Sequence, residues 1–414
     1  MITRVFLQSL QEMLAVFPVV ALVGPRQVGK STLVLDESIA RSRRYTTLDS
    51  IPDRTLAESD PVGFLSDPEP TTIDEVQLVP DLLREIKRNV DRDRTPGRYL
   101  ITGSADLNYA SDLSHVLAGR VGLVELPPAT LFERYRAQNG SDCRPAWVSF
   151  LEQGPAALSA HAREPSSAPF SWHDLTVGGF PLSVLAQSDR ARELWLDSFR
   201  TTFLERDLRR LSEIGDLVGF SRLMQLSASR TAGVLNQAGL ARDAGLKQQT
   251  VGRYLSLLEA GLLIRRVPGW FSNIGKRIVK SPKLYWRDAG VASFLSGIGA
   301  EAIEHHPLRG ALFETMAIGE LAALLPVYLH GARLFHLRTH DGLEVDAIVQ
   351  HRNQLYPFEV KASRTVSAGD ATAIERWIDL ASSTTPTPAE WGCVLYAGTT
   401  FQQLSRRVWA VSVV

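Results

Sequence analysis

One loop in the sequence has the residue types that bind phosphate. It follows a short apolar run and consists of Gly24, Pro25, Arg26, Gln27, Val28, Gly29, Lys30, Ser31 and Thr32. This is the G-x-x-x-x-G-K-[ST] pattern in the strand-to-helix setting that it requires. Glycines let the backbone curl round phosphates, which loop N–H groups and the positive end of the following helix attract. We expect Lys30 to reach the β- and γ-phosphates of a nucleotide and Ser31 to hold Mg²⁺.

Two later strand ends carry polar groups that suit the same site. A short strand ends in Asp74 and Glu75. Asp74 is expected to coordinate Mg²⁺, directly or through water, and Glu75 to polarise the attacking water as general base. A third strand ends in small polar residues, so Ser104 or Thr102 is placed to contact the γ-phosphate. For the acidic strand end alone, chance is the alternative explanation.

The order of these motifs resembles the AAA+ ATPases, and more closely a bacterial family with G-P-R-Q-x-G-K-[ST], D-E-[IV]-Q, G-S and [LA]-x-G-R segments. The matching segments here are residues 24–31, Asp74-Glu75-Val76-Gln77, Gly103-Ser104 and Leu117-Ala118-Gly119-Arg120. The resemblance implies an ATPase domain over residues 1–135, with ATP as its nucleotide. It also makes Arg120 a candidate for stabilising transition-state charge, in cis or in trans. A solvated surface arginine is an equally weighted alternative.

The next segments predict structure and little chemistry. Residues 136–172 are rich in Gly, Ser, Ala and Pro and are interpreted as an insertion or linker with one short helix. Residues 173–230 show helical spacing and are interpreted as a helical connector.

A winged helix is predicted over residues 231–292. Short helices are joined at Gly245, and a further helix ends before Gly261 and an apolar strand. Lys and Arg outnumber Asp and Glu in this region, which suits phosphate contacts. The predicted contacts to nucleic acid, DNA more than RNA, are Lys247, Arg253, Lys276, Arg277 and Lys280. The alternative is a winged helix that packs between domains, with its charges on a solvated face.

A second group of chemical residues is predicted in the last third of the chain. Asp346 and Glu359 lie on adjacent predicted strands, and Lys361 shares a strand face with Glu359. Carboxylates so placed bind Mg²⁺ or Mn²⁺, and a nearby ammonium can orient the attacking water. With Glu314 on the preceding helix, the set resembles the PD-(D/E)xK nuclease core. The resemblance implies a nuclease-like domain over residues 300–414, with Asp346 and Glu359 as metal ligands and Glu314, Asp346, Glu359 and Lys361 as catalytic candidates.

Composition limits the class of protein. The 414 residues hold 45 Lys and Arg against 45 Asp and Glu, so attraction to nucleic acid must come from a local patch. Cys143 and Cys393 are far apart, which supports neither a disulfide framework nor a Cys-based zinc site. We expect no membrane span and a cytoplasmic location. The AAA+ resemblance makes a homo-oligomer plausible.

Together these patterns predict a multidomain α/β protein with a P-loop ATPase sheet, a helical connector, a winged helix and a restriction-endonuclease-like α/β domain. The expected function is Mg²⁺-dependent ATP binding and hydrolysis coupled to nucleic-acid binding, with metal-dependent DNA cleavage as a further activity. Two alternatives stay open: a DNA-binding ATPase switch whose nuclease-like domain is only a scaffold, and an ATP-driven protein-interaction or regulatory module.

Overall fold

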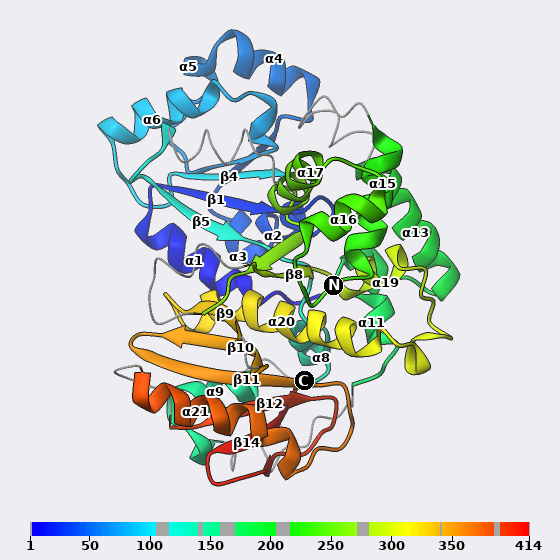
Figure 1. The fold of residues 1–414 in the computed structure, drawn as a ribbon. Helices are drawn as coiled ribbons and strands as arrows, with labels where there is room; N and C mark the ends of the chain where they lie inside the picture. The colour runs from blue at the N-terminus through cyan, green and yellow to red at the C-terminus, as the bar shows by residue number, and fades with distance from the viewer. Residues whose placement is uncertain are drawn as a thin grey trace.

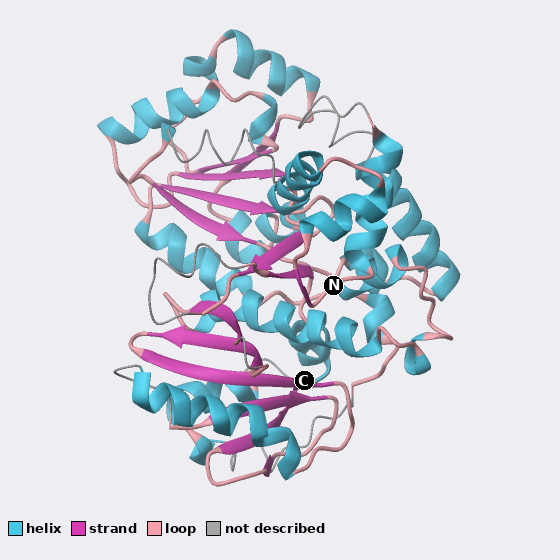
Figure 2. Cartoon of the chain, viewed as in Figure 1, coloured by secondary structure: helices cyan, strands magenta, loops and turns pink. Residues whose placement is uncertain are grey.

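The computed structural model describes residues 2–104, 116–139, 144–157, 170–203, 216–270, 281–339, 342–384 and 390–413. Two large sheets lie at opposite ends of the molecule, and helix α20 (Arg309–Tyr328) crosses the space between them (Figure 1). Helices gather on one side of this arrangement, around a small third sheet (Figure 2).

The N-terminal sheet is parallel and has the strand order β2-β3-β4-β1-β5. Its strands are β1 (Val19–Gly24), β2 (Arg44–Thr47), β3 (Thr71–Asp74), β4 (Tyr99–Ser104) and β5 (Val121–Glu125). Apolar side chains alternate between its two faces: Val20 and Leu22 join one hydrophobic cluster, and Val19 and Ala21 join another. Because both faces are covered, the central strand is a continuous apolar run.

Short helices surround this sheet. They are α1 (Phe6–Val16), α2 (Lys30–Val34), α3 (Glu37–Ala40), α4 (Ile51–Ser59), α5 (Pro61–Phe64), the 3₁₀ turn η1 (Val76–Leu78) and α6 (Leu82–Arg92). Leu10 of α1 packs on the face that holds Val20, and Ile86 of α6 packs on the face that holds Val19. The carboxyl ends of the parallel strands are left at one edge, where ligands bind in sheets of this kind.

The middle of the chain forms a helical unit with a small antiparallel sheet of order β6-β8-β7. Its elements are α8 (Leu131–Asn139), α11 (Asp174–Val177), α12 (Pro181–Val184), α13 (Asp189–Thr202), α15 (Leu217–Ala228), β6 (Gly233–Val234), α16 (Gln237–Ala244), α17 (Gln248–Ala260), β7 (Ile264–Val267), β8 (Lys283–Trp286) and α19 (Ala289–Leu295). Gly245 ends α16 in the left-handed conformation, as the sequence suggested. Helix α15 packs against α16 and β8, so the unit begins before the predicted boundary at residue 231.

The C-terminal sheet is mixed, with the order β13-β14-β12-β11-β10-β9. Its strands are β9 (Arg333–Arg338), β10 (Glu344–His351), β11 (Gln354–Lys361), β12 (Gly392–Tyr396), β13 (Gln402–Gln403) and β14 (Val408–Ser412). Helices α20 and α21 (Thr372–Thr384) both contact β11, and 3₁₀ turns η4 (Ile303–His305) and η5 (Ala368–Ala371) precede them. Strands β9, β10 and β11 are antiparallel, whereas β12 and β14 run parallel to β11.

Helix α9 (Ala146–Gln153) is a short helix of the kind expected in residues 136–172, but it belongs to a hydrophobic core and not to an exposed linker. Its residues from Ala146 to Leu151 are all buried, and it is followed by the 3₁₀ turn η2 (Pro155–Ala157). Trp147 makes an edge contact with Phe358 of β11, and Phe150 contacts Trp391 and Trp409. The segment therefore supplies a core helix to the C-terminal sheet.

Helix α20 differs from the expectation that no apolar stretch is long enough for a membrane. By length and composition it is the one helix among the described residues that could span a bilayer. Two thirds of its most apolar window is buried inside the protein, as in a core helix. It carries Glu314 and Glu320, both of which bond to other elements of the fold.

Candidate functional site

The predicted phosphate loop connects β1 to α2 at the carboxyl edge of the N-terminal sheet. Gln27 and Gly29 both have positive φ, at 61° and 98°, so the loop is curled. Lys30 is only 6% exposed, and its ammonium donates to the carbonyl oxygens of Gly24 (3.0 Å) and Pro25 (2.9 Å). The loop and its lysine thus form a closed turn with a cation at its centre.

Asp74 ends β3 and is held rigidly by two hydroxyl groups. The Tyr45 hydroxyl donates to its Oδ2 at 2.9 Å, and the Thr102 hydroxyl donates to its Oδ1. Burial and the Asp74 charge raise the pKa of Tyr45, which keeps that hydroxyl a donor. Thr102 therefore orients the carboxylate from the next strand, β4.

Glu75 follows in the left-handed region, with φ 58°, a conformation uncommon outside glycine. Its backbone N–H donates to the Thr102 hydroxyl at 3.3 Å, and the Gln77 amide donates to its carboxylate. The strained backbone turns Glu75 out of the strand direction while Asp74 stays in it. Such strain is concentrated at functional sites.

The remaining predicted loop residues fit a magnesium–nucleotide ligand. Ser31 and Thr32 are exposed at the start of α2, where a hydroxyl is open to a ligand. The hard oxygen donors of Ser31 and Asp74 suit Mg²⁺, and the Lys30 ammonium suits phosphate oxygens. Ser104 is paired with Gly24 at the end of β4, and its side chain lies outside the described part of the chain.

Residues from outside the sheet contact this loop, which the sequence did not predict. The Trp195 indole of α13 donates to the Gln27 amide oxygen at 2.9 Å. A side chain at Gly29 would lie against Pro181 of α12. On the other side, the Arg4 guanidinium donates to the Val28 carbonyl at 3.2 Å. The loop is therefore in direct contact with the middle of the chain.

Arg120 is not brought to this site within the molecule. It directly precedes β5, and Val121 is paired with Val19 at the start of β1, so it lies at the opposite edge of the sheet from the loop. Its guanidinium donates to Asp91 and to the carbonyl of Ala118. The prediction of a cis role is wrong, because the length of β1 separates Arg120 from Gly24; the trans role stays a prediction.

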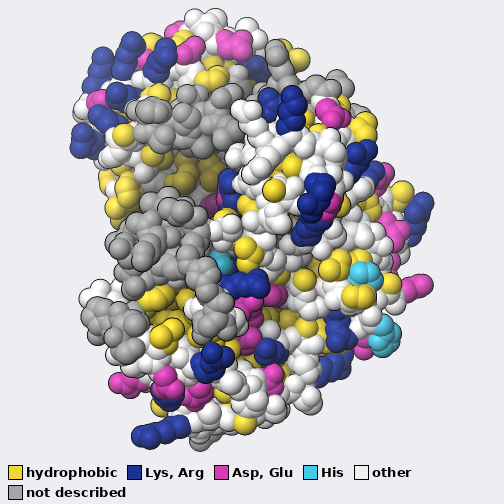
Figure 3. All heavy atoms as spheres, viewed as in Figure 1, with side chains coloured by type: hydrophobic (Ala, Val, Ile, Leu, Met, Phe, Trp, Pro, Cys, Tyr) yellow, Lys and Arg dark blue, Asp and Glu magenta, His cyan; other side chains and the backbone are white. Residues whose placement is uncertain are grey.

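The second predicted set is brought together between α20, β10 and β11. Asp346 accepts from the Val360 backbone N–H at 2.9 Å, and the Lys361 ammonium donates to Glu359 at 2.8 Å. We call Glu314, Glu344, Asp346 and Glu359 the acidic cluster. Acidic side chains gather near the centre of the face in Figure 3, with basic side chains beside them.

A lysine from the predicted basic region lies inside this cluster. The Lys283 ammonium is 2.9 Å from Glu314, 2.9 Å from Glu344 and 3.1 Å from Asp346. The Tyr285 hydroxyl, also on β8, donates to Glu314 at 2.6 Å. Across the described ranges, no three His, Cys, Asp or Glu side chains are grouped to hold a metal ion. Asp346 lies close enough to Glu359 for its charge to act on that carboxyl group, and its own two oxygens accept from Lys283 and from the Val360 N–H. Metal binding by Asp346 and Glu359 stays a prediction.

Burial and charge alter the protonation of this cluster. Burial and the neighbouring Asp346 charge raise the pKa of Glu314 and that of Glu359 to about 7. Although burial opposes it, the charges of Asp346 and Glu314 raise the pKa of Lys283, so the lysine is an ammonium. A β-bulge between Val345 and Ile348 places Asp346 at an irregular point of the ladder with β9, and bulges are frequent next to functional sites.

Several described basic side chains of residues 231–292 are used in ion pairs inside the protein. Arg265 and Arg287 both pair with Glu125 at the end of β5, and Arg266 pairs with Glu259. Lys283 is buried in the acidic cluster. Figure 3 shows the Lys and Arg side chains around α16 and α17 as separate groups. The net charge of the segment therefore overstates its exposed charge, because several of its basic groups form internal ion pairs.

Two of the predicted nucleic-acid contacts are on the described surface. Lys247 directly precedes α17, Arg253 lies on its second turn, and both side chains are exposed. The predicted contacts Lys276, Arg277 and Lys280 lie outside the described residues.

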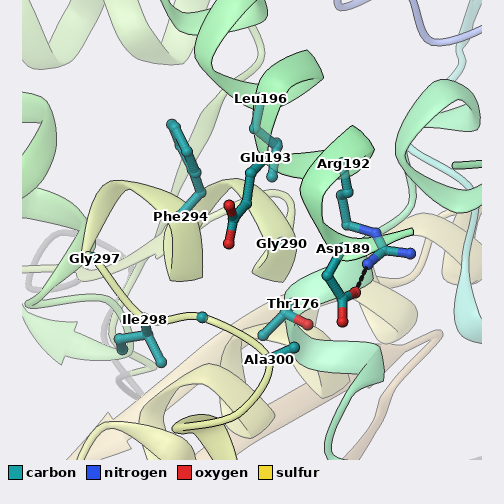
Figure 4. Close-up of a pocket in the computed structure, with 11 residues that line it drawn as sticks. Thr176, Asp189, Arg192, Glu193, Leu196, Gly290, Phe294, Gly297, Ile298 and Ala300 are labelled. Carbon is teal, nitrogen blue, oxygen red and sulfur yellow. Dashed lines mark hydrogen bonds and ion pairs between the residues drawn. The ribbon is translucent and has the colours of Figure 1, made fainter.

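A cavity of about 200 Å³ lies between α13, α19 and the loop that follows α19 (Figure 4). Leu196 and Glu193 enter it from α13, and Phe294 faces them. Asp189 and Arg192 at its edge are paired with each other. The cavity contains none of the residues predicted for either site.

Several site residues escaped the sequence analysis. Strand alternation could have predicted Glu344, because it is two residues before Asp346 and so shares its strand face. The sequence indicates Lys283 only weakly, as the single charged residue in the run Lys-Leu-Tyr-Trp of a buried strand. No sequence pattern indicates Tyr45 or Trp195, since their partners are far away in the sequence and the contacts depend on the tertiary fold.

The parallel sheet, the phosphate loop after β1 and the Asp74–Glu75 pair define an AAA-type P-loop ATPase domain. Residues 16–135 match the family model described as an AAA domain. Residues 172–302 and 309–414 match two domains of unknown function, DUF8612 and DUF4143. The chain belongs to the family of the uncharacterized protein Rv2008c of Mycobacterium tuberculosis. It is 35% identical to that protein over 359 residues, covering 84% of this chain and 71% of the relative, and the same values hold for Mb2031c of Mycobacterium bovis.

Solved structures give more distant likenesses. The Walker-type ATPase PabY2304 of Pyrococcus abyssi is 16% identical, with a TM-score of 0.41, covering 70% of this chain and 94% of its own. A point variant of RuvB from Thermotoga maritima is 19% identical, with a TM-score of 0.28, covering 63% of this chain and 88% of its own.

Proposed function

We propose that the protein binds and hydrolyses ATP with Mg²⁺ at the P-loop, and that the middle of the chain responds to the nucleotide. The observation that carries the proposal is the carboxyl edge of the N-terminal sheet. There the Lys30 loop and Ser31 lie on one strand connection, and the oriented Asp74 and Glu75 lie on another.

Each side chain of the site has a role that follows from its chemistry. Lys30 exchanges its bonds to the Gly24 and Pro25 carbonyls for phosphate oxygens when a nucleotide enters. Ser31 and Asp74 would hold the Mg²⁺, and the ion would supply positive charge beside the phosphates. Glu75 accepts a proton from the attacking water, and Gln77 holds its carboxylate.

Three variants of the full chain test this proposal. Lys30→Ala should lose ATP binding in a calorimetric titration while its circular dichroism spectrum stays unchanged. Glu75→Gln should bind ATP and lose turnover by about 10²–10⁴-fold, the usual contribution of a general base. Arg120→Ala is the matched control, and at protein concentrations that keep it monomeric its turnover should equal that of the parent. Unchanged turnover in Lys30→Ala would refute the P-loop assignment.

A second proposal concerns α15 to β8, whose order of helix, strand, two helices and two strands is that expected of a winged helix. The exposed Lys247 and Arg253 at the start of α17 favour contact with a nucleic-acid backbone. Because several other basic groups of the unit are paired, we propose weak, salt-sensitive binding of duplex DNA.

Fluorescence anisotropy with a labelled DNA duplex tests this second proposal over a range of salt concentrations. Replacing Lys247 or Arg253 by Ala should weaken binding and reduce the slope of log affinity against log salt by about one for each phosphate that the variant no longer neutralises. Arg266→Ala, which removes an arginine already paired with Glu259, is the control. Binding that none of these variants changes would refute this surface. A parent chain that binds no DNA would favour the protein-interaction or regulatory module instead.

Metal-dependent DNA cleavage is the activity that the geometry supports least. The four predicted residues are adjacent, but the Lys283 ammonium contacts the same carboxylates. Incubation of the parent and of Asp346→Ala with supercoiled DNA, Mg²⁺ or Mn²⁺ and ATP tests for cleavage, and we expect none from either protein.

A further inference from the structure

Lys283 is a cation enclosed by carboxylates, and it comes from a different part of the fold. It is the first residue of β8 and is 2% exposed. Its partners Glu314, Glu344 and Asp346 lie on α20 and β10. The contact between Lys283 and Asp346 spans 63 residues of sequence.

The lysine occupies the space that a metal ion would need. Mg²⁺ and Ca²⁺ bind carboxylate oxygens at about 2.0–2.6 Å. The Lys283 nitrogen is already 2.9–3.1 Å from one oxygen of each of three carboxylates. An ion bound to those oxygens would overlap the ammonium and would meet its positive charge at close range.

Lys283 cannot easily leave, because β8 is fixed on both sides. The strand pairs with β6 and with β7, and all four of its side chains are buried. Tyr285 anchors it to Glu314, and Arg287, just beyond its end, pairs with Glu125 of the ATPase sheet. The lysine is therefore part of a rigid element.

The other side of the cluster carries a second ammonium. Lys361 donates to Oε1 of Glu359, and Oε2 of the same carboxylate is buried with no hydrogen-bond partner among the described residues. Two ammonium groups thus face four carboxylates. A divalent ion in place of Lys283 would supply one more positive charge than the ammonium does, and the three carboxylate oxygens around that position are the type of ligand that such ions take.

We propose that Lys283 is the resident cation of the acidic cluster, which holds β8 against the C-terminal domain and binds no divalent metal ion while the lysine is in place. The cluster is then an ionic connection between the middle unit and the C-terminal sheet. The proposal concerns a different site from the P-loop and does not depend on ATP turnover.

Mn²⁺ is a suitable probe, because free Mn²⁺ has a strong electron paramagnetic resonance signal that binding removes. The full chain is titrated with Mn²⁺ without nucleotide, as the parent, Lys283→Met and the double variant Lys283→Met with Asp346→Asn. We expect Lys283→Met to gain one Mn²⁺ site at least tenfold tighter than any Asp346-dependent binding in the parent. The added Asp346→Asn change should remove that site.

Thermal unfolding gives an independent readout of the same change. Mn²⁺ should raise the Tm of Lys283→Met, whose carboxylates have lost their cation, and should leave the parent unchanged. Lys361→Met is the matched control: it removes the other ammonium and should gain no comparable site, since Lys283 stays in place.

Two results would overturn the proposal. One is Mn²⁺ binding by the parent that Asp346→Asn abolishes. The other is a folded Lys283→Met protein that gains no site. If Lys283→Met does not fold, Lys283→Gln combined with Glu314→Gln removes one charge of each sign, and failure of that folded variant to bind Mn²⁺ through Asp346 also refutes the proposal.

Discussion

His336 shows how one buried side chain can carry a pH dependence. It lies on β9 opposite the bulge that contains Asp346, and it is 3% exposed. Burial and the nearby Lys283 charge lower the pKa of His336 to about 4. In the unfolded chain the same imidazole titrates near 6.5. Between these two values the unfolded chain therefore binds a proton that the folded protein does not.

The sign of the effect on stability follows from this difference. Above about pH 6.5 the imidazole is neutral in both states, so its protonation does not affect the free energy of unfolding. As the pH falls from there toward 4, the unfolded chain binds a proton that the folded protein does not, and the fold loses stability. Replacing the imidazole by Leu should remove up to about 1.4 kcal/mol per pH unit from the slope in this window. Urea midpoints of the parent and His336→Leu, measured from pH 7 to pH 4, test this. Parallel curves would contradict it.

At the scale of elements, α9 shows where a local pattern misleads. Gly, Pro and Ser residues flank it, and these predicted a linker around a segment that is buried. Its aromatic side chains contact residues of β11 and β14 and the segment before β12, which lie more than 200 residues later in the chain. A local sequence pattern contains no sign of such partners.

Truncating one of these aromatics should therefore be costly. Phe150→Ala leaves a cavity beside Trp391 and Trp409, for which losses of about 3–5 kcal/mol are typical. Leu194→Ala on α13 is the control, because that side chain is 57% exposed and should change stability by less than about 0.5 kcal/mol. Equal denaturation midpoints for the two variants would contradict the assignment of residues 146–153 to the hydrophobic core.

Much of the first site could be predicted from sequence, whereas the second could be predicted only in part. The Lys30 loop and the Asp74 strand end are contiguous motifs whose geometry follows from strand and loop rules. Asp346 and Glu359 were also predictable as neighbours, because a short hairpin joins their strands. Lys283 was not, since its position depends on how β8 docks against α20, and no local pattern contains that information.

At the scale of the whole molecule, the residues between Lys283 and Val291 connect all three parts. Lys283 enters the acidic cluster, Arg287 pairs with Glu125 of the ATPase sheet, and Asp288 accepts from the Gly179 N–H at 2.6 Å. Gly179 lies two residues before Pro181, which lies beside Gly29 of the P-loop. A change at the nucleotide site therefore has a continuous route of contacts to the C-terminal domain.

Removing the hydrogen bond between Trp195 and Gln27 tests whether the middle unit influences nucleotide binding. Trp195→Phe keeps an aromatic ring beside Phe180 and Phe199 but loses the donor to the P-loop. Losing one hydrogen bond of about 0.5–1.5 kcal/mol should weaken ATP binding about 2–10-fold. Calorimetric titration measures this, with Trp409→Phe on β14 as the control. An ATP affinity equal to that of the parent would show that the two units are independent at this contact.

The packing of α9 against β14 also determines when this helix can complete its contacts during synthesis. About 250 residues separate Gln153 from Val408. At ~5–20 residues per second, a ribosome needs about 12–50 s to make the strand that covers the helix. Phe358, the partner of Trp147, and Trp391, one partner of Phe150, are made before β14, whereas Trp409 is made only with it. The contacts of α9 therefore form one after another, after residues 16–135 have been made. The C-terminal sheet therefore completes its packing on α9 only after β14 has been made, and a fragment starting after residue 153 would lack one of its core helices.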